Sequence, residues 1–271
     1  MGTSLSSTRR RVLHCTVVSR QRGKGKDLHD DSVLTWPQGN KFLVDKLSSL
    51  TNLDFFGGHL LFKVDGNNLH FYDFKKKETI RVEAEQIVLN LPQFIIAKLF
   101  NQKTEFEYAP WMVANLKIKW NESLDNSLAW DNVNYHGKGL GIVSSNHQKL
   151  NINLQENILT YYWPLSHLKP KDARKFALKR SHESWTQDIL DDIQPMIFDI
   201  QERIKSIDIW PWGHGMIKPY KSFFYKTRKN LVKTPQNIHV AHTDLGGLSL
   251  FEEGFYRGEV SALKVKKGFK L

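Results

Sequence analysis

The feature that most constrains the fold is a segment near the C-terminus, Ile238–Gly258, where an apolar stretch leads to an acidic residue, paired glycines and a helical pattern. Ile238–Ala241 is predicted as a short strand, Gly246-Gly247 as a turn, and the chain from about Ser249 as a helix. Glycines let a ligand approach the backbone closely, and the amides at a helix N-terminus favour negative charge. This arrangement suits a ligand with phosphate and hydroxyl groups, as a flavin has.

The same segment resembles the C-terminal flavin-binding signature of the amine oxidase and phytoene desaturase superfamily. That signature is a strand, Ala-Gly-Asp or Ala-Gly-Glu, a glycine-bearing loop, Glu-Gly-Ala, and a later Ser-Gly. Asp244 matches the acidic position, and Glu253-Gly254 matches the Glu-Gly of the helix. His242-Thr243 replaces the usual glycine step, and Arg257-Gly258 stands where Ser-Gly is usual.

Three further segments resemble this family in the expected chain order. Pro37–Asn40, followed by a helical pattern, is similar to the Pro-x-Gly-Gly turn, with Asn40 in place of the second glycine. Leu61–Val64 is similar to the strand that follows, and Ala84–Pro92 matches the Ala-x-x-Val-Ile-x-x-x-Pro strand. With the C-terminal signature, the resemblance extends over nearly all of the chain from Leu34 to Ala262.

The resemblance implies an α/β (α+β) fold: a substrate-binding sheet with helices, as in FAD-linked reductases, plus the final strand and helix of a Rossmann-like FAD domain. It implies FAD as the cofactor and a small molecule as the substrate. The enzyme would transfer a hydride from a C–N or C–C bond of the substrate to FAD. The sequence offers no competing chemistry, such as paired carboxylates at glycosidase spacing, a Ser-His-Asp order or a metal-ligand cluster.

The resemblance also implies site residues. The implied cofactor-binding residues are Gly39, Trp212, His214, Asp244, Gly246, Gly247, Leu248, Ser249, Glu253 and Gly254. The implied substrate-contacting residues are Tyr108, Trp111 and Tyr162, and His242 is a candidate for a hydrogen bond to flavin or substrate. Each aromatic residue also has a plain interpretation as core packing, and each histidine as a structural residue.

The N-terminal part of such a flavoenzyme has no counterpart in this sequence. Flavoproteins of this type bind ADP through a strand, a G-x-G-x-x-G turn and a helix. Gly23-Lys24-Gly25 is the nearest pattern, and it lies in a basic stretch without a third glycine or a following helical pattern. The alternative hypothesis is therefore a non-catalytic remnant, or a subunit that needs a second chain for FAD binding.

Periodicity predicts the remaining organisation. Strands are expected at 59–65, 69–74, 79–82, 87–91, 111–120, 140–144 and 158–163, and helices at 42–50, at 93–100 and within 171–207, with a break at Pro195. The predicted domains are a basic segment at 1–30, a remnant of the FAD domain at 31–100, a substrate domain at 101–210, an FAD-binding strand, turn and helix at 211–263, and a basic tail at 264–271.

The net charge of +11 lies at the two ends of the chain. Residues 1–26 contain seven Lys and Arg, residues 264–271 contain four Lys, and neither segment contains an acid. Solvated ends are the plain interpretation. A nucleic-acid or membrane-surface binder acting through these tails is a third hypothesis, although no nucleic-acid-reading motif accompanies them.

The expected location is the cytoplasm, although two N-terminal patterns resemble targeting signals. No stretch approaches the roughly 20 apolar residues of a membrane span. Thr8–Leu13 faintly resembles a twin-arginine signal, which leaves export open, and Met1-Gly2 with Ser6 fits a myristoylation consensus. Cys15 is the single cysteine, so no internal disulfide is possible.

Overall fold

The computed structural model describes residue 36 and residues 38–120, 128–145, 155–218 and 231–269. The predicted basic segment 1–30 lies outside these residues. The described chain forms two compact units: one combines Asn52–Phe106 with Ile217–Leu271, and the other combines Thr35–Thr51 with Glu107–Met216. We call the first the nucleotide-side unit, because it contains most of the segments that resemble an FAD domain, and the second the sheet unit, and each is described by itself.

The nucleotide-side unit begins with a three-stranded antiparallel sheet of β1 (His59–Asp65), β2 (Asn68–Asp73) and β3 (Glu78–Glu83). Asp65 pairs with Asn68 at the tip of the first hairpin, where Gly66 has a φ of +59°. The positive φ explains the glycine, because other residues rarely adopt this conformation. The three predicted strands are confirmed.

A second, parallel pair of strands lies in the same unit. β4 (Ile87–Leu89) pairs with β10 (Ile238–Val240), so segments about 150 residues apart lie side by side. α3 (Gln93–Leu99) follows β4, while the short helix η2 (Thr243–Leu245) and then α9 (Phe251–Gly268) follow β10. The unit's core consists of Leu69, Ile87, Leu89, Ile96, Ala97, Val232 and Ile238.

The predicted basic tail is a helix for most of its length. α9 continues to Gly268, so Lys264, Lys266 and Lys267 belong to its last turns. Cations near a helix C-terminus interact favourably with the partial negative charge of the unpaired carbonyls there. A solvated basic run is therefore compatible with a helix, and residues 264–268 belong to α9.

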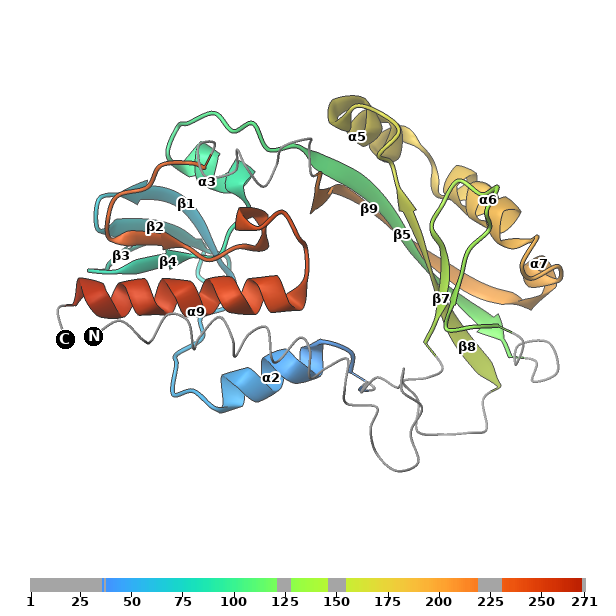
Figure 1. The fold of residues 1–271 in the computed structure, drawn as a ribbon, viewed down its shortest axis with the longest axis horizontal. Helices are drawn as coiled ribbons and strands as arrows, with labels where there is room; N and C mark the ends of the chain where they lie inside the picture. The colour runs from blue at the N-terminus through green and yellow to red at the C-terminus, as the bar shows by residue number, and fades with distance from the viewer. Residues whose placement is uncertain (1–35, 37, 121–127, 146–154, 219–230, 270–271) are drawn as a thin grey trace, which may run out of the picture. The chain divides into compact units, whose positions relative to one another are not determined.

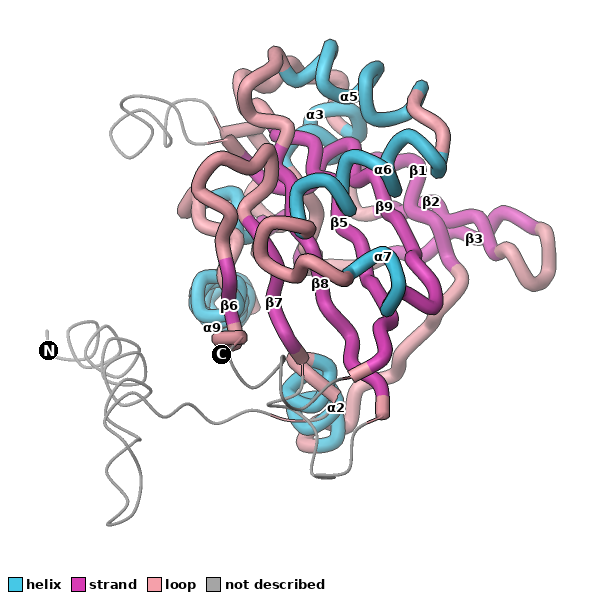
Figure 2. Tube along the Cα trace, turned by 90° about the vertical axis from the view of Figure 1, so that its right-hand side faces the viewer, coloured by secondary structure: helices cyan, strands magenta, loops and turns pink. Residues whose placement is uncertain are grey.

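The sheet unit contains a five-stranded sheet in the order β6-β7-β8-β5-β9. The strands are β5 (Tyr108–Lys119), β6 (Asp131–Asn132), β7 (Gly141–Ser144), β8 (Glu156–Pro164) and β9 (Ile204–Ile217). α5 (Pro170–Lys179), α6 (His182–Ile193) and α7 (Ile200–Arg203) lie along one face of this sheet (Figures 1 and 2). The unit also includes α2 (Lys41–Ser49), at the predicted helix.

Side chains of β5 and β8 alternate between the two faces of this sheet. One set is buried with α5 to α7 and includes Met112, Ala114, Leu116, Ile118, Leu159, Tyr161 and Trp163. The alternate set, which includes Trp111, Val113, Asn115, Thr160 and Tyr162, is partly exposed. Strand periodicity of two thus gives the sheet an apolar, helix-covered face and a more polar face.

The prediction of helical territory throughout 171–207 is wrong at its end. α6 ends at Ile193, as Pro195 predicted, but β9 begins at Ile204 and continues to Ile217. Ile204, Ile207 and Ile209 pack against the core from this strand. Isoleucine at these spacings is compatible with a bulged or twisted strand as well as with a helix. Residues 204–217 form a strand because they pair with β5 at the edge of the sheet.

The carboxylate of Asp192 ties α6 to the sheet and to the loop before β7. Asp192 is 6% exposed. Its two oxygens accept hydrogen bonds from the backbone N–H groups of Lys138 (2.8 Å) and Gly139 (3.0 Å) and from the hydroxyl of Tyr161 (2.5 Å). Burial, together with this hydrogen bond to Asp192, raises the pKa of Tyr161.

Replacing Asp192 with Asn should destabilise the sheet unit. An amide has one acceptor oxygen where the carboxylate has two, so at least one buried donor would lose its partner, at about 1–3 kcal/mol. Urea unfolding followed by tryptophan fluorescence measures this, because all eight tryptophans fall within residues 36–212. Asp191→Asn, at the neighbouring exposed position, is the control and should change the midpoint little. Equal midpoints for the two variants would contradict the role given to Asp192.

An ion-pair cluster at the other end of β8 gives a pH-dependent prediction. Lys117 (2.7 Å) and Lys205 (2.5 Å) hold the Glu156 carboxylate and lower its pKa from 4.5 to about 2. A lowered carboxyl pKa stabilises the fold above the unfolded value and loses that effect as pH falls toward the folded value. The stability difference between the protein and Glu156→Gln should therefore be constant above about pH 5.5 and shrink between pH 4.5 and 2. A carboxyl NMR titration of Glu156 centred near its ordinary value would contradict this.

Candidate flavin-binding site

The candidate site is built on the carboxyl ends of the two parallel strands, β4 and β10. Because the strands are parallel, the segments that leave them emerge at the same edge. One segment runs through Pro92 into α3, and the other, residues 241–250, runs through η2 and a glycine turn into α9. We call residues 241–250 the Asp244 loop. Ligands of parallel α/β sheets characteristically bind at this edge.

Asp244 joins the two segments. Its side chain is buried, with 2% of the residue exposed, and its Oδ2 accepts a hydrogen bond of 2.9 Å from the backbone N–H of Gln93, the first residue of α3. The amides of a first helical turn have no partner within the helix, and a carboxylate there is also favoured by the helix dipole. The acidic residue that the sequence singled out is therefore turned inward, where it fixes the start of α3.

Gln93 extends this connection to a third segment. Its side chain is fully buried, and its Oε1 accepts a hydrogen bond of 3.0 Å from the backbone N–H of Val232. Thus residues 92–93, 232 and 244 are held together by two hydrogen bonds. Sequence reasoning missed Gln93; its position directly after Pro92 at a helix start was the available signal.

Gly246-Gly247 makes the turn that the sequence predicted. Gly247 has a φ of +69°, which glycine adopts without strain. Gly246 lies against a side chain of α9: a Cβ there would be 2.0 Å from Oε1 of Glu253. Arg257, one turn further along α9, donates to that same oxygen at 2.6 Å. The Glu253 carboxylate is therefore packed on the turn and neutralised by Arg257.

The start of α9 is open to a ligand. Its N-cap residue is Leu250, which provides no side-chain acceptor for the first amides of the helix. Leu248, Ser249 and Leu250 are exposed. Three predicted cofactor residues, Gly247, Leu248 and Ser249, therefore lie at or beside a helix N-terminus whose first amides receive no hydrogen bond from the side chain of the N-cap residue.

The predicted histidine candidate, His242, also contributes to the loop. Its Nδ1 accepts a hydrogen bond of 3.1 Å from the backbone N–H of Asp244 and so caps η2. Gly254, on α9, faces η2, where a Cβ would lie 3.4 Å from the Thr243 methyl group. The conformation of the Asp244 loop is therefore fixed from within.

The other predicted cofactor residues belong to the sheet unit. Gly39 has a φ of +59° in the turn before α2, which is consistent with the predicted glycine turn. Trp212 and His214 are exposed on β9. The His214 ring lies 5.9 Å from that of Tyr108 in an edge-to-face arrangement, so a predicted cofactor residue and a predicted substrate residue meet there.

Trp111 and Tyr162, predicted as substrate contacts, share the more polar face of the sheet. Trp111 pairs with Pro164 and Tyr162 with Val113, which makes the two aromatic residues diagonal neighbours on β5 and β8. Trp111 packs directly against Gly215 of β9, where a Cβ would lie 2.8 Å from its Cδ1. Burial, and then the nearby carboxylate of Asp131, raise the pKa of Tyr162, so its hydroxyl stays protonated at neutral pH.

The described residues offer neither a metal cluster nor a membrane-spanning helix. None of their His, Cys, Asp and Glu side chains gather into a group of three that could hold a metal ion. None of the helices in these same ranges is long and apolar enough to cross a membrane.

Comparisons with known proteins establish the fold. No protein-family model and no curated protein matches the sequence. Among solved structures, a protein from Exiguobacterium sp. 255-15, provisionally assigned as a protoporphyrinogen oxidase, matches 85% of this chain and 52% of its own, with a TM-score of 0.57 and 12% identity. Cyclohexylamine oxidase from Brevibacterium oxydans IH-35A matches 76% and 47%, with a TM-score of 0.52 and 9% identity.

A single-residue variant of putrescine oxidase, made in a redesign of cofactor binding, gives a similar result. It matches 90% of this chain and 56% of its own, with a TM-score of 0.59 and 11% identity. The chain thus has a mixed α/β fold similar to part of these oxidases, which confirms the predicted fold and resemblance. It spans about half the length of the solved structures that it matches.

Removing the Asp244 carboxylate should loosen the Asp244 loop. In Asp244→Ala the buried amide of Gln93 loses its acceptor, which costs about 1–3 kcal/mol. Native-state proteolysis with peptide mapping of residues 231–250 should therefore show cleavage at lower urea than in the unaltered protein. Asp54→Ala removes an exposed carboxylate in the same unit and is the control. If both variants resist cleavage equally, Asp244 does not hold the loop.

Proposed function

We propose that this chain forms the substrate-side part of an FAD-dependent oxidoreductase of the amine oxidase type, which oxidises a C–N or C–C bond of a small molecule. The observation that carries the proposal is the edge of the parallel pair. Two parallel strands each lead into a helix at the same edge of the pair, and a hydrogen bond to a buried carboxylate links the two segments. The likeness to amine-oxidising enzymes supports the same assignment at the level of fold.

The residues at this edge fit a flavin. The exposed residues Leu248 and Ser249 lead into the uncapped N-terminus of α9, whose first backbone amides can donate to an electron-rich or anionic part of the cofactor. FAD, when bound, accepts the hydride that the substrate loses. Asp244 serves this site as a positioning residue, because both its burial and its bond to Gln93 direct it inward.

Electrostatics at the start of α9 are consistent with such a ligand. Glu252 and Glu253 are in the first turn, where carboxylates compete with an anion for the helix dipole. Arg257 pairs with Glu253 at 2.6 Å and so removes much of that competition. Glu252 is exposed, so solvent and salt screen its charge.

The proposed substrate-side residues are those of the sheet unit. Trp111 and Tyr162 provide aromatic surface on one sheet face, and Tyr108 with His214 provides an aromatic pair at the meeting of β5 and β9. Aromatic rings with few polar groups are typical of sites for small organic substrates. The protonated hydroxyl of Tyr162 is available as a donor that orients a substrate.

A second candidate function is a subunit that binds FAD only with a second chain. Two observations favour it: the sequence has no G-x-G-x-x-G strand, turn and helix, and the chain spans about half the length of the matched structures. A polypeptide that carries a G-x-G-x-x-G unit would then supply the ADP site, and this chain would supply the Asp244 loop and the sheet.

The test is flavin retention by the purified chain. After addition of FAD and desalting, retained absorbance near the flavin bands is expected, and Ser249→Glu should weaken flavin binding at least about tenfold by charge repulsion. An acidic residue just before α9 favours the helix, so this variant is expected to fold. Ser249→Gln has similar size without the charge and should retain flavin.

The outcomes separate the two candidates. Retention that Ser249→Glu alone reduces supports the flavin site on this chain and justifies assays with amines and polyenes. A colourless protein contradicts FAD binding by the chain alone. In that case, recovery of flavin on mixing with a G-x-G-x-x-G polypeptide supports the subunit function, and failure there contradicts both.

A further inference from the structure

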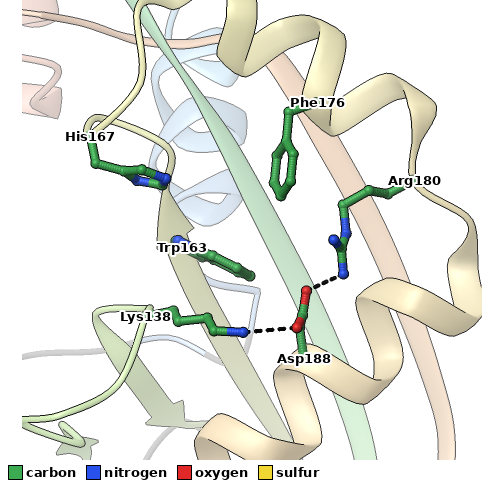
Figure 3. A pocket seen from close by; sticks show the side chains of 6 residues that line it. All are labelled: Lys138, Trp163, His167, Phe176, Arg180 and Asp188. Carbon is green, nitrogen blue, oxygen red and sulfur yellow. Dashed lines mark hydrogen bonds and ion pairs between the residues drawn. The ribbon is translucent and has the colours of Figure 1, made fainter.

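A cavity of about 540 Å³ lies within the sheet unit, and none of the predicted site residues lines it. It is lined by Lys138, Trp163, His167, Phe176, Arg180 and Asp188. Figure 3 shows these six side chains arranged around one opening, between the loop before β7, the end of β8 and helices α5 and α6. Its volume is in the range of sites for small organic ligands.

Two aromatic rings of the lining, Trp163 and Phe176, pack against a third ring behind them. Trp185, which is 2% exposed, contacts Trp163 and Phe176 edge to face, with ring centroids 5.4 and 5.6 Å away. The Arg180 guanidinium lies over the faces of both Phe176 and Trp185, at 5.1 and 5.0 Å. Such cation–π contacts hold a guanidinium in place and keep its charge near the apolar wall.

Two cations in the cavity share one anion. The Lys138 ammonium lies over the Trp163 ring at 5.7 Å and pairs with Oδ1 of Asp188 at 2.9 Å. Arg180 pairs with Oδ2 of the same carboxylate. The lining therefore holds two cations and one anion, which leaves one positive charge without a counterion among the lining residues.

Arg180 and Lys138 each have a donor for which the described residues provide no acceptor. Arg180 donates to Asp188 and to the Ser184 carbonyl, but its Nε is buried without an acceptor in the described ranges. An ammonium has three donors, and Asp188 takes one from Lys138. The Lys138 side chain is 56% exposed, so its other donors are accessible to a ligand, whereas a buried donor without a partner, such as Arg180 Nε, is uncommon in native proteins.

We infer that this cavity binds a small acidic molecule with a flat apolar body. Lys138 binds its carboxylate or phosphate group in place of Asp188, the internal counterion, which stays paired with Arg180. Trp163 and Phe176 contact its apolar body. The inference does not rest on the proposed flavin chemistry, since all six lining residues belong to the sheet unit.

Calorimetric titration with naphthoate, naphthamide and naphthylmethylammonium tests the inference. These probes share one flat body and differ in charge. Naphthoate should bind about tenfold tighter than naphthamide, the size expected for a charge-assisted contact, and the cation should bind more weakly than the amide. Equal affinities, or no binding at millimolar concentrations, would overturn the inference.

Three variants locate the binding. Lys138→Gln should weaken naphthoate binding about tenfold, whereas Lys175→Gln removes an equal charge from the exposed face of α5 and should leave it unchanged. Asp188→Asn should tighten it several-fold, because the competing internal carboxylate is gone. If Asp188→Asn does not fold, the two lysine variants still decide the question.

The two lysine variants are therefore expected to differ. A loss of naphthoate binding confined to Lys138→Gln supports the cavity, and equal effects of both variants overturn it. Ser249→Glu, in the nucleotide-side unit, should leave naphthoate binding unchanged, so failure of the flavin site and failure of this cavity are distinguished. Naphthoate binding that Ser249→Glu abolishes would assign the probe to the other unit and overturn the inference.

Discussion

The hydrogen bond from the Gln93 amide to the Asp244 carboxylate is the interaction on which the nucleotide-side unit depends. A parallel pair of three-residue strands buries little surface, and each strand offers few backbone hydrogen bonds. The carboxylate adds a charge-assisted bond between the segments that leave these strands, in a place where water does not compete. Without it, the start of α3 would have an unsatisfied amide, and the Asp244 loop would lose its fixed position beside α9.

A buried carboxylate also fixes a loop in the sheet unit. Asp192 projects from α6 and satisfies two loop amides and the Tyr161 hydroxyl, so a buried carboxylate again fixes a loop against regular structure. The loop fixed in this way carries Lys138, which the cavity between β8, α5 and α6 uses as a cation. Each proposed binding site is therefore supported by a buried carboxylate, Asp244 or Asp192, which accepts hydrogen bonds from backbone amides and does not itself face the ligand.

The fold was largely predictable from local pattern, and the sites only in outline. Alternation in β5 and β8, the hairpin at Gly66 and the strand, turn and helix around Gly247 follow from residue types a few positions apart. The β9 strand was missed because Ile204, Ile207 and Ile209 suit helix and strand alike until a neighbouring strand is known. Asp244 was found, but its inward direction depends on Gln93, some 150 residues away. Asp188, Asp191 and Asp192 are likewise indistinguishable in sequence until packing buries one of them.

Residues 86–93 and 237–246 are expected to form one cooperative structure at the edge of the parallel pair. Hydrogen exchange followed by mass spectrometry, with peptides that cover each segment separately, measures this. Both segments should be protected, and their amides should open together, with the same free energy and the same response to denaturant. Fast exchange in one segment while the other stays protected would show that β4, β10 and the Asp244 bond are not a single unit.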